Sequence, residues 1–193
     1  MNVLVEPPLK VEDAELTQRE IVFVLDCSGS MEGAPLDVSK RFMRRALKSL
    51  RSNDLFRVIR FSDSSTEFSD EPLLGTPANI ESGLEYIEGL RSEGGTEMTA
   101  GIHAALDRDL VPDTTRIVVF LTDGYIGNDV DVIRLVNQTR KDARLFTFGI
   151  GSAVNDYLLK EVARVGRGVC RIVRPEENAE AAADALAKRL EAP

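Results

Sequence analysis

The stretch that decides the fold is Ile21-Val22-Phe23-Val24-Leu25-Asp26-Cys27-Ser28-Gly29-Ser30-Met31. Its first five residues are apolar and mostly β-branched or aromatic, with no polar residue between them. Such a run is typical of a strand that is covered on both faces in a parallel sheet. The run ends at an acidic residue, and small polar residues follow it. The stretch therefore predicts a buried strand that brings polar side chains to one edge of a sheet.

The rest of the chain alternates between strand-like and helix-like segments. Further apolar runs cover 56–61, 117–121, 145–150 and 169–173, and helical spacing of apolar residues covers 35–50, 78–90, 97–106, 130–139, 156–165 and 176–190. Segment 66–68 is short and half polar, which predicts an antiparallel edge strand. Together these segments predict a Rossmann-like, doubly wound α/β fold. We expect a mainly parallel six-stranded sheet, with one short antiparallel edge strand and helices on both faces.

Length and composition limit the classes of protein to consider. The 193 residues fit one domain, which we place at 20–193 after an extended lead-in over 1–19. The net charge of −8 argues against nucleic acid as a partner, because tracking phosphates requires clustered positive charge. No apolar run reaches the roughly 18 residues needed to cross a bilayer, so direct membrane insertion is not expected.

Oxygen-bearing side chains stand at the predicted carboxyl ends of the strands, where ligands bind in open α/β sheets. Asp26, Ser28 and Ser30 alternate after the first strand, Asp123 follows the strand over 117–121, and Thr96 ends a Gly-Gly-Thr turn before a helix. Hard oxygen donors without nitrogen or sulfur suit Mg²⁺, and also Mn²⁺ or Ca²⁺, whereas they argue against a zinc site. The pattern therefore predicts a site for a divalent cation.

These motifs resemble the metal-ion-dependent adhesion site (MIDAS) of von Willebrand factor A (VWA) domains. The resemblance covers about residues 20–190, and all five key positions match: Asp26, Ser28, Ser30, Thr96 and Asp123. It implies that the hydroxyls of Ser28, Ser30 and Thr96 bind the metal directly and that Asp26 and Asp123 act mainly through water. It also implies that an Asp or Glu carboxylate of a protein partner completes the coordination, so that the domain serves adhesion or protein binding without catalysis.

Within that family, the segments around Cys27, 54–61 and 122–128 are most similar to the inter-alpha-trypsin inhibitor heavy chain group and its bacterial relatives. This likeness implies a longer parent chain with other domains and a secreted, periplasmic or cell-surface location. In integrin-type relatives, ligand exchange is coupled to a shift of the last helix, here 176–190. Magnesium-chelatase-type assemblies offer another setting, in which such a domain docks on an ATPase ring inside the cell.

Two other functions remain open at this point. Phosphoryl transfer of the haloacid dehalogenase type would use Asp26 as the nucleophile, but that family carries a second Asp where this chain has Ser28. Alternatively, the site is vestigial and the chain is a structural domain of a larger protein, with Asp26 and Asp123 acting only as helix caps.

The remaining reactive or charged residues are interpreted as structural. His103, the one histidine, is expected to have a surface or packing role. Cys27 and Cys170 are too few for a disulfide framework and are expected to be small buried side chains, although a bridge between them is left open. The six basic residues between Lys40 and Arg51 favour a solvated helix face, with a docking patch for an acidic partner as the alternative.

Overall fold

A computed structural model of the chain describes residues 17–124, 126–174 and 177–191. Most of the lead-in predicted over 1–19 therefore lies outside the described residues. Within the described part, every helix is too short or too polar to cross a membrane.

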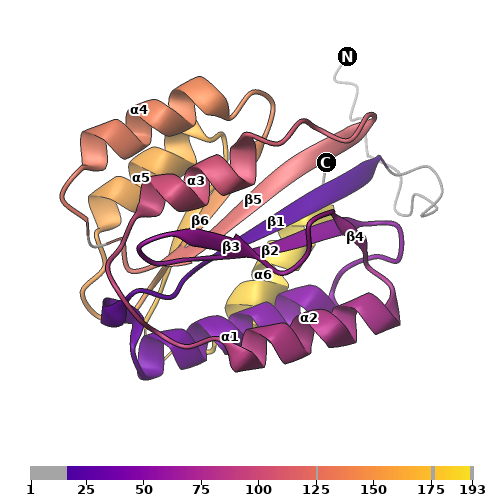
Figure 1. Cartoon of the computed structure of the whole chain (residues 1–193), viewed down its shortest axis with the longest axis horizontal. Helices are drawn as coiled ribbons and strands as arrows, with labels where there is room; N and C mark the ends of the chain where they lie inside the picture. The colour runs from indigo at the N-terminus through magenta and orange to yellow at the C-terminus, as the bar shows by residue number, and fades with distance from the viewer. Residues whose placement is uncertain (1–16, 125, 175–176, 192–193) are drawn as a thin grey trace, which may run out of the picture.

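The described strands form one twisted sheet in the order β3-β2-β1-β5-β6-β7, and β4 also pairs with β2 (Figure 1). Their bounds are β1 Gln18–Asp26, β2 Leu55–Phe61, β3 Ser65–Glu67, β4 Leu73–Leu74, β5 Thr114–Thr122, β6 Arg144–Ile150 and β7 Cys170–Val173. Strands β2, β1, β5, β6 and β7 are parallel, whereas β3 and β4 run antiparallel to β2.

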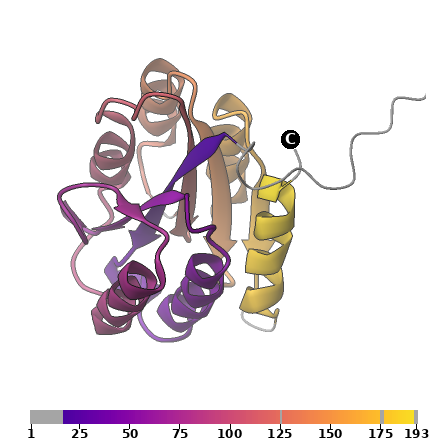
Figure 2. The ribbon, with the colours of Figure 1, turned by 90° about the vertical axis from the view of Figure 1, so that its right-hand side faces the viewer.

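Helices cover both faces of the sheet, as Figures 1 and 2 show. One face packs against α1 (Ala34–Lys48), α2 (Pro77–Gly89) and α6 (Ala179–Glu191). The other face packs against α3 (Met98–Leu106), α4 (Asp129–Thr139) and α5 (Asp156–Val165). A short 3-10 helix, η2 (Gly29–Met31), lies between β1 and α1.

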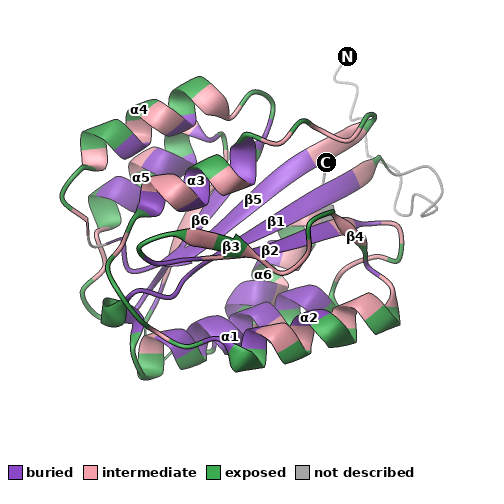
Figure 3. Ribbon diagram, in the orientation of Figure 1, coloured by how far each residue is buried: buried purple, intermediate pink, exposed green. Residues whose placement is uncertain are grey.

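The central strand β1 is buried on both sides, which explains its unbroken apolar sequence (Figure 3). Phe23 and Leu25 belong to the core beneath α1, α2 and α6, and Val22 and Val24 belong to the core beneath α3, α4 and α5. Successive side chains of a strand point to opposite faces, so each residue of the run enters one of the two cores.

The predicted fold class is confirmed, with differences at element ends and one strand that was not predicted. Strand β4 consists of Leu73–Leu74 between a proline and a glycine, and two residues are too few to produce a periodic pattern. Helix α6 begins at Ala179, whereas a start at Glu176 was predicted; Glu176 itself lies outside the described residues.

The strand order reverses at β1 and β5, which are neighbours in the sheet. From β1 the chain continues through α1 to β2 on one side, and from β5 it continues through α4 to β6 on the other side. Two connections therefore diverge from the carboxyl ends of β1 and β5, which is where open α/β sheets bind their ligands.

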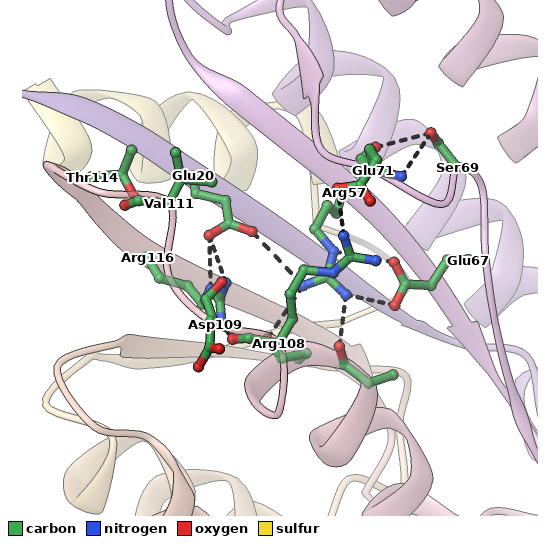
Figure 4. A network of polar contacts seen from close by, with 12 residues as sticks. Glu20, Arg57, Glu67, Ser69, Glu71, Arg108, Asp109, Val111, Thr114 and Arg116 are labelled. Atoms are coloured by element: carbon green, nitrogen blue, oxygen red, sulfur yellow. Dashed lines mark hydrogen bonds and ion pairs between the residues drawn. The ribbon is translucent and has the colours of Figure 1, made fainter.

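A buried ion network fixes the opposite end of the sheet (Figure 4). Glu20 is fully buried; Arg116 Nε donates to its Oε2 at 2.8 Å, and Arg57 Nη1 lies 3.8 Å from its Oε1. Arg57 also donates to the carbonyl of Ala104 at 2.7 Å, and Arg116 donates to that of Arg108 at 2.6 Å. Carbonyls at a helix C-terminus attract cations, so the two arginines anchor the end of α3 and the connection after it to the sheet.

Candidate functional site

Asp26 ends β1 as a fully buried carboxylate, and each of its oxygens accepts a hydrogen bond. The backbone N–H of Ser28 donates to Oδ1 at 2.9 Å, and the Thr122 hydroxyl donates to Oδ2 at 2.5 Å. The Thr122 hydroxyl in turn accepts from the N–H of Gly124 at 2.8 Å, so its own proton is directed to Asp26. These bonds fix the orientation of the carboxylate between the ends of β1 and β5.

The environment of Asp26 is unfavourable for its negative charge. Burial raises the pKa of Asp26, the hydrogen bonds from Ser28 and Thr122 lower it in part, and the nearby charge of Asp123 raises it further. Desolvation and a second carboxylate both disfavour the ionised form, whereas a cation beside them would favour it. The electrostatics of this edge of the sheet therefore suit a positive ion.

The loop after Asp26 brings two hydroxyls together. The Oγ atoms of Ser28 and Ser30 are 3.1 Å apart, with Ser28 buried and Ser30 exposed. Met31, which is fully buried, anchors η2 in the core and so fixes the loop. One serine is thus oriented from inside the domain, while the other lies open to solvent.

The Gly94-Gly95-Thr96 turn lies directly against this loop, because the N–H of Gly29 donates to the carbonyl of Gly94 at 3.0 Å. The N–H of Gly95 donates to Asp63 Oδ1 at 2.7 Å, from the connection between β2 and β3. Thr96 is half-buried at the end of the turn. The structure therefore brings the segment that carries Thr96 next to the segment that carries Ser28 and Ser30.

Asp123 follows β5 directly and is 9% exposed. Its backbone carbonyl accepts from the N–H of Asn155 at 2.8 Å, which fixes the connection after β5 against the start of α5. Burial is the main cause of the raised pKa of Asp26, and the charge of Asp123 adds a smaller contribution in the same direction.

The chemistry of this edge depends on hydroxyls as much as on carboxylates. Across the described residues, no group of three or more His, Cys, Asp or Glu side chains is placed to hold a metal ion. The two predicted acids, Asp26 and Asp123, would have to act together with Ser28, Ser30 and Thr96. Sequence reasoning gave no role to Thr122 or to Asp63, although both bind groups of this site.

An open hollow lies beside the connection after β5. It is lined by Ile126, Gly127, Ala153, Val154 and Asn155. The surface next to Asp123 is therefore partly apolar and concave.

The two cysteines are free, so no bridge joins them. Cys27 belongs to the core beneath α1, on the other side of the backbone from Asp26, and burial raises the pKa of its thiol to about 12. Cys170 is half-buried, and burial raises the pKa of its thiol as well. Neither thiol is activated as a nucleophile.

His103 and the basic helix have structural roles. His103 Nδ1 lies 2.9 Å from Asp107 Oδ2 on the exposed side of α3. In α1, Lys40 is buried and donates to the carbonyls of Glu88 and Leu90, at 3.0 and 2.9 Å. The prediction that Lys40 contributes to a solvated face is therefore wrong, because it binds the last carbonyls of α2.

Two neighbours of Lys40 are also paired within the domain. Arg44 binds Glu88 of α2, and Arg45 binds Asp184 of α6. These pairs use part of the positive charge that the alternative prediction, a docking patch for an acidic partner, requires.

Comparisons with known proteins agree with this architecture. A family model described as von Willebrand factor type A domain matches residues 19–172. A von Willebrand factor A domain-containing protein of Dictyostelium discoideum is 32% identical over 169 residues, which are 86% of this chain and 18% of that protein. The chain thus spans about a fifth of the length of this curated relative.

Solved structures show the same fold. A von Willebrand factor type A structure from Catenulispora acidiphila superposes with a TM-score of 0.78 at 19% identity, over 90% of this chain and 42% of that chain. Proximal thread matrix protein 1 from the mussel byssus, described with a zinc-occupied MIDAS motif, gives a TM-score of 0.73 at 20% identity, over 90% and 46% of the two chains. VWA domains are generally non-enzymatic modules that mediate protein interactions within larger proteins. With most of its length matched by the family model, the chain belongs to the von Willebrand factor type A domain family.

Proposed function

We propose that this domain binds a divalent cation, Mg²⁺ in the first place, and uses it to bind an Asp or Glu carboxylate of a protein partner. The observation that carries the proposal is the 3.1 Å separation of the Ser28 and Ser30 hydroxyl oxygens. In octahedral coordination at the roughly 2.1 Å typical of Mg²⁺, neighbouring oxygen ligands lie about 3.0 Å apart. The two serines are thus spaced as adjacent ligands of such an ion.

The donor set fits the ion by its chemistry. Ser28, Ser30 and Thr96 would bind it through neutral hydroxyls, and Asp26 and Asp123 would act mainly through water. Both oxygens of Asp26 already accept hydrogen bonds, so this residue is better suited to orienting water than to direct, two-oxygen binding. A bound cation would supply a coordination position for an anionic oxygen from outside the domain.

The same geometry argues against Asp26 as a phosphoryl-accepting nucleophile. A nucleophile must expose an oxygen to its substrate, whereas Asp26 is fully buried and bonded at both oxygens. Ser28 stands where the haloacid dehalogenase pattern has its acid and base, and its hydroxyl is engaged with Ser30. We therefore propose binding rather than phosphoryl transfer.

Membership of the family supports the proposal for the partner and the setting. VWA domains in larger proteins mediate protein interactions, and this chain spans only part of its curated relatives. We propose that the partner presents an acidic residue, with apolar residues beside it facing the hollow near Ile126 and Val154. Kinship with the inter-alpha-trypsin inhibitor heavy chain group, and a location outside the cytoplasm, belong to the same proposal.

The metal should be identified by calorimetry on protein stripped with EDTA. We expect Mg²⁺ and Mn²⁺ to bind the wild-type domain, and Asp26→Ala and Ser28→Ala to lose most of that affinity. Ca²⁺ and Zn²⁺ should be titrated too, because the mussel structure contains zinc in a MIDAS motif. Ser64→Ala is a matched control, since Ser64 is an exposed serine in a neighbouring loop. Negligible heats for the wild type, or equal heats for the wild type and Asp26→Ala, would refute the site.

The carboxylate should be tested with a displayed peptide library selected in Mg²⁺ and eluted with EDTA. Enrichment of peptides with Asp or Glu, and loss of their binding to Ser28→Ala, is the expected result. Selected peptides without an acid, or binding that survives EDTA, would contradict metal-mediated recognition.

A further inference from the structure

The Asp63 carboxylate occupies the space that side chains at positions 94 and 95 would take if these residues were not glycines. A Cβ atom built at Gly94 would lie 2.1 Å from Asp63 Oδ2, and one built at Gly95 would lie 2.7 Å from Oδ1. Real Cβ atoms do not approach other atoms so closely, so the two glycines provide the space for this carboxylate. Gly94 also has φ of +72°, which L-residues with a side chain rarely adopt.

Three hydrogen bonds fix the turn from two sides. The N–H of Gly29 donates to the Gly94 carbonyl at 3.0 Å, the N–H of Glu97 donates to the Ser62 carbonyl at 2.7 Å, and the N–H of Gly95 donates to Asp63 Oδ1 at 2.7 Å. Two of these bonds join backbone to backbone. The third is made by a charged side chain, and hydrogen bonds to ionised acceptors are roughly twice as strong as neutral ones.

The position of this bond is informative, because Gly95 directly precedes Thr96. The far end of α3 is anchored separately by Arg57 and Arg116, so Asp63 acts on the end of this segment that carries Thr96. The Asp63 side chain is exposed, so its contribution to the core is small. Removal of a buried anchor would lower the stability of the fold and also displace the turn. Removal of the exposed Asp63 side chain should mainly affect the position of the turn.

We propose that Asp63 is a positioning residue that fixes the Thr96 hydroxyl for cation binding by accepting the hydrogen bond from Gly95. The inference rests on the proposed function, since it explains how Thr96, one of the proposed metal ligands, is held in position. Residues that orient metal ligands from behind typically change metal affinity by about 10- to 100-fold when they are removed.

The test is a comparison of Mn²⁺ affinities, measured by calorimetry and by electron paramagnetic resonance of free Mn²⁺. Asp63→Ala should weaken binding by about tenfold. Asp63→Asn keeps an oxygen that accepts from Gly95 and should stay within about threefold of the wild type. The unfolding midpoint of both variants in EDTA should stay within about 2 °C of the wild type, as expected for an exposed side chain. Asp70→Ala, which removes another exposed carboxylate, serves as the control.

A double-mutant cycle with Thr96→Ala tests whether Asp63 acts through Thr96. If it does, Asp63→Ala should have no further effect in the Thr96→Ala background. Additive losses would show that Asp63 acts independently of Thr96, and equal losses for Asp63→Asn and Asp63→Ala would show an effect of charge alone. Either result would overturn the inference. Wild-type affinity in Asp63→Ala would overturn it while leaving the proposed function intact. Absence of Mn²⁺ binding to the wild type would instead refute the proposed function, and the inference with it.

Discussion

The hydroxyl of Thr122 donates to Asp26 Oδ2 at 2.5 Å, across the point where the strand order of the sheet reverses. This bond links the last residues of β1 and β5 by a side chain, one position beyond the last backbone pair of the two strands, Leu25 with Leu121. The position of Asp26 therefore depends on a neighbouring strand.

Thr122→Val should remove the hydroxyl at almost constant shape and leave Asp26 Oδ2 without its donor. We expect a loss of about 1–3 kcal/mol in the free energy of unfolding, the usual effect of leaving a buried polar atom unsatisfied. Urea unfolding at neutral pH measures it. Thr122→Ser restores the donor and should recover most of the loss; a serine variant as unstable as the valine variant would assign the effect to packing instead.

Asp26→Asn should change both the pH dependence of stability and its response to metal. The pKa of Asp26 is raised in the folded state, mainly by burial, so its contribution to stability is fully present below the unfolded pKa. That contribution is lost as pH rises through the folded pKa. In EDTA, the asparagine variant should therefore gain stability relative to the wild type between acid and neutral pH. Denaturant titrations at several pH values give the comparison.

Bound metal should reverse the order of stability, so that the wild type becomes more stable than Asp26→Asn. A cation present at a hundredfold excess over its Kd stabilises the domain that binds it by about 2.7 kcal/mol. We expect this increment for the wild type in Mg²⁺ and little of it for Asp26→Asn. Equal increments in the two proteins would mean that Mg²⁺ stabilises the fold without Asp26.

Gly94→Ala should destabilise the domain, because its φ of +72° and the adjacent Asp63 carboxylate both oppose a side chain. A positive φ costs an L-residue roughly 1–2 kcal/mol, which sets the expected loss in urea unfolding. Gly89→Ala is the matched control. Nothing lies within 4 Å of a Cβ atom at that position in α2, so it should be neutral or stabilising.

Arg57→Leu should be among the most damaging single substitutions in the domain. It would leave Glu67 without its buried cationic partner and Glu20 with Arg116 alone, and breaking a buried pair typically costs about 3–5 kcal/mol. Arg134→Leu provides the contrast. Its pair with Asp131 is exposed, and such pairs contribute at most about 1 kcal/mol. Similar unfolding free energies for the two variants would contradict a structural role for the network.

Cys27 should resist alkylation in the folded domain. The pKa of its thiol is raised to about 12 by burial, so the reactive thiolate is scarce at pH 8. Cys170 is half-buried and should react with iodoacetamide faster than Cys27, though more slowly than after unfolding in urea. Mass spectrometry of timed samples distinguishes the two; equal rates in the folded state would show that the segment directly after β1 opens readily.

Much of the site followed from where the apolar runs end. Asp26 and Asp123 were found because buried parallel strands have a recognisable composition, and the residues after such strands converge at one edge. Thr96 was noted in a Gly-Gly-Thr turn before a helix, but only the family resemblance gave it the role of a metal ligand, since such a turn alone has many meanings. Whether these residues share an ion stays a prediction.

What the sequence could not reveal depends on contacts between distant segments. Asp63 is an exposed acid in a loop, and its partner Gly95 is 32 positions away. Lys40 was placed on the solvated side of its helix because lysine usually lies there, but its ammonium group reaches the end of α2. Helical spacing describes the faces of one helix and contains no information on which neighbour covers them.

The two short strands beside β2 have a further consequence. Strand β3 pairs with residues 59–61, β4 pairs with 55–56, and the N–H of Phe68 donates to the carbonyl of Val58 at 2.8 Å between them. Exposed strand edges are where sheets from separate molecules join and aggregate. Along most of this edge, in the part of the chain that the structure describes, the backbone groups are already occupied. A second molecule therefore cannot pair with β2 without first displacing β3 and β4. The edge that remains outside them consists of strands of only three and two residues, and such short edge strands offer little to strand-to-strand aggregation.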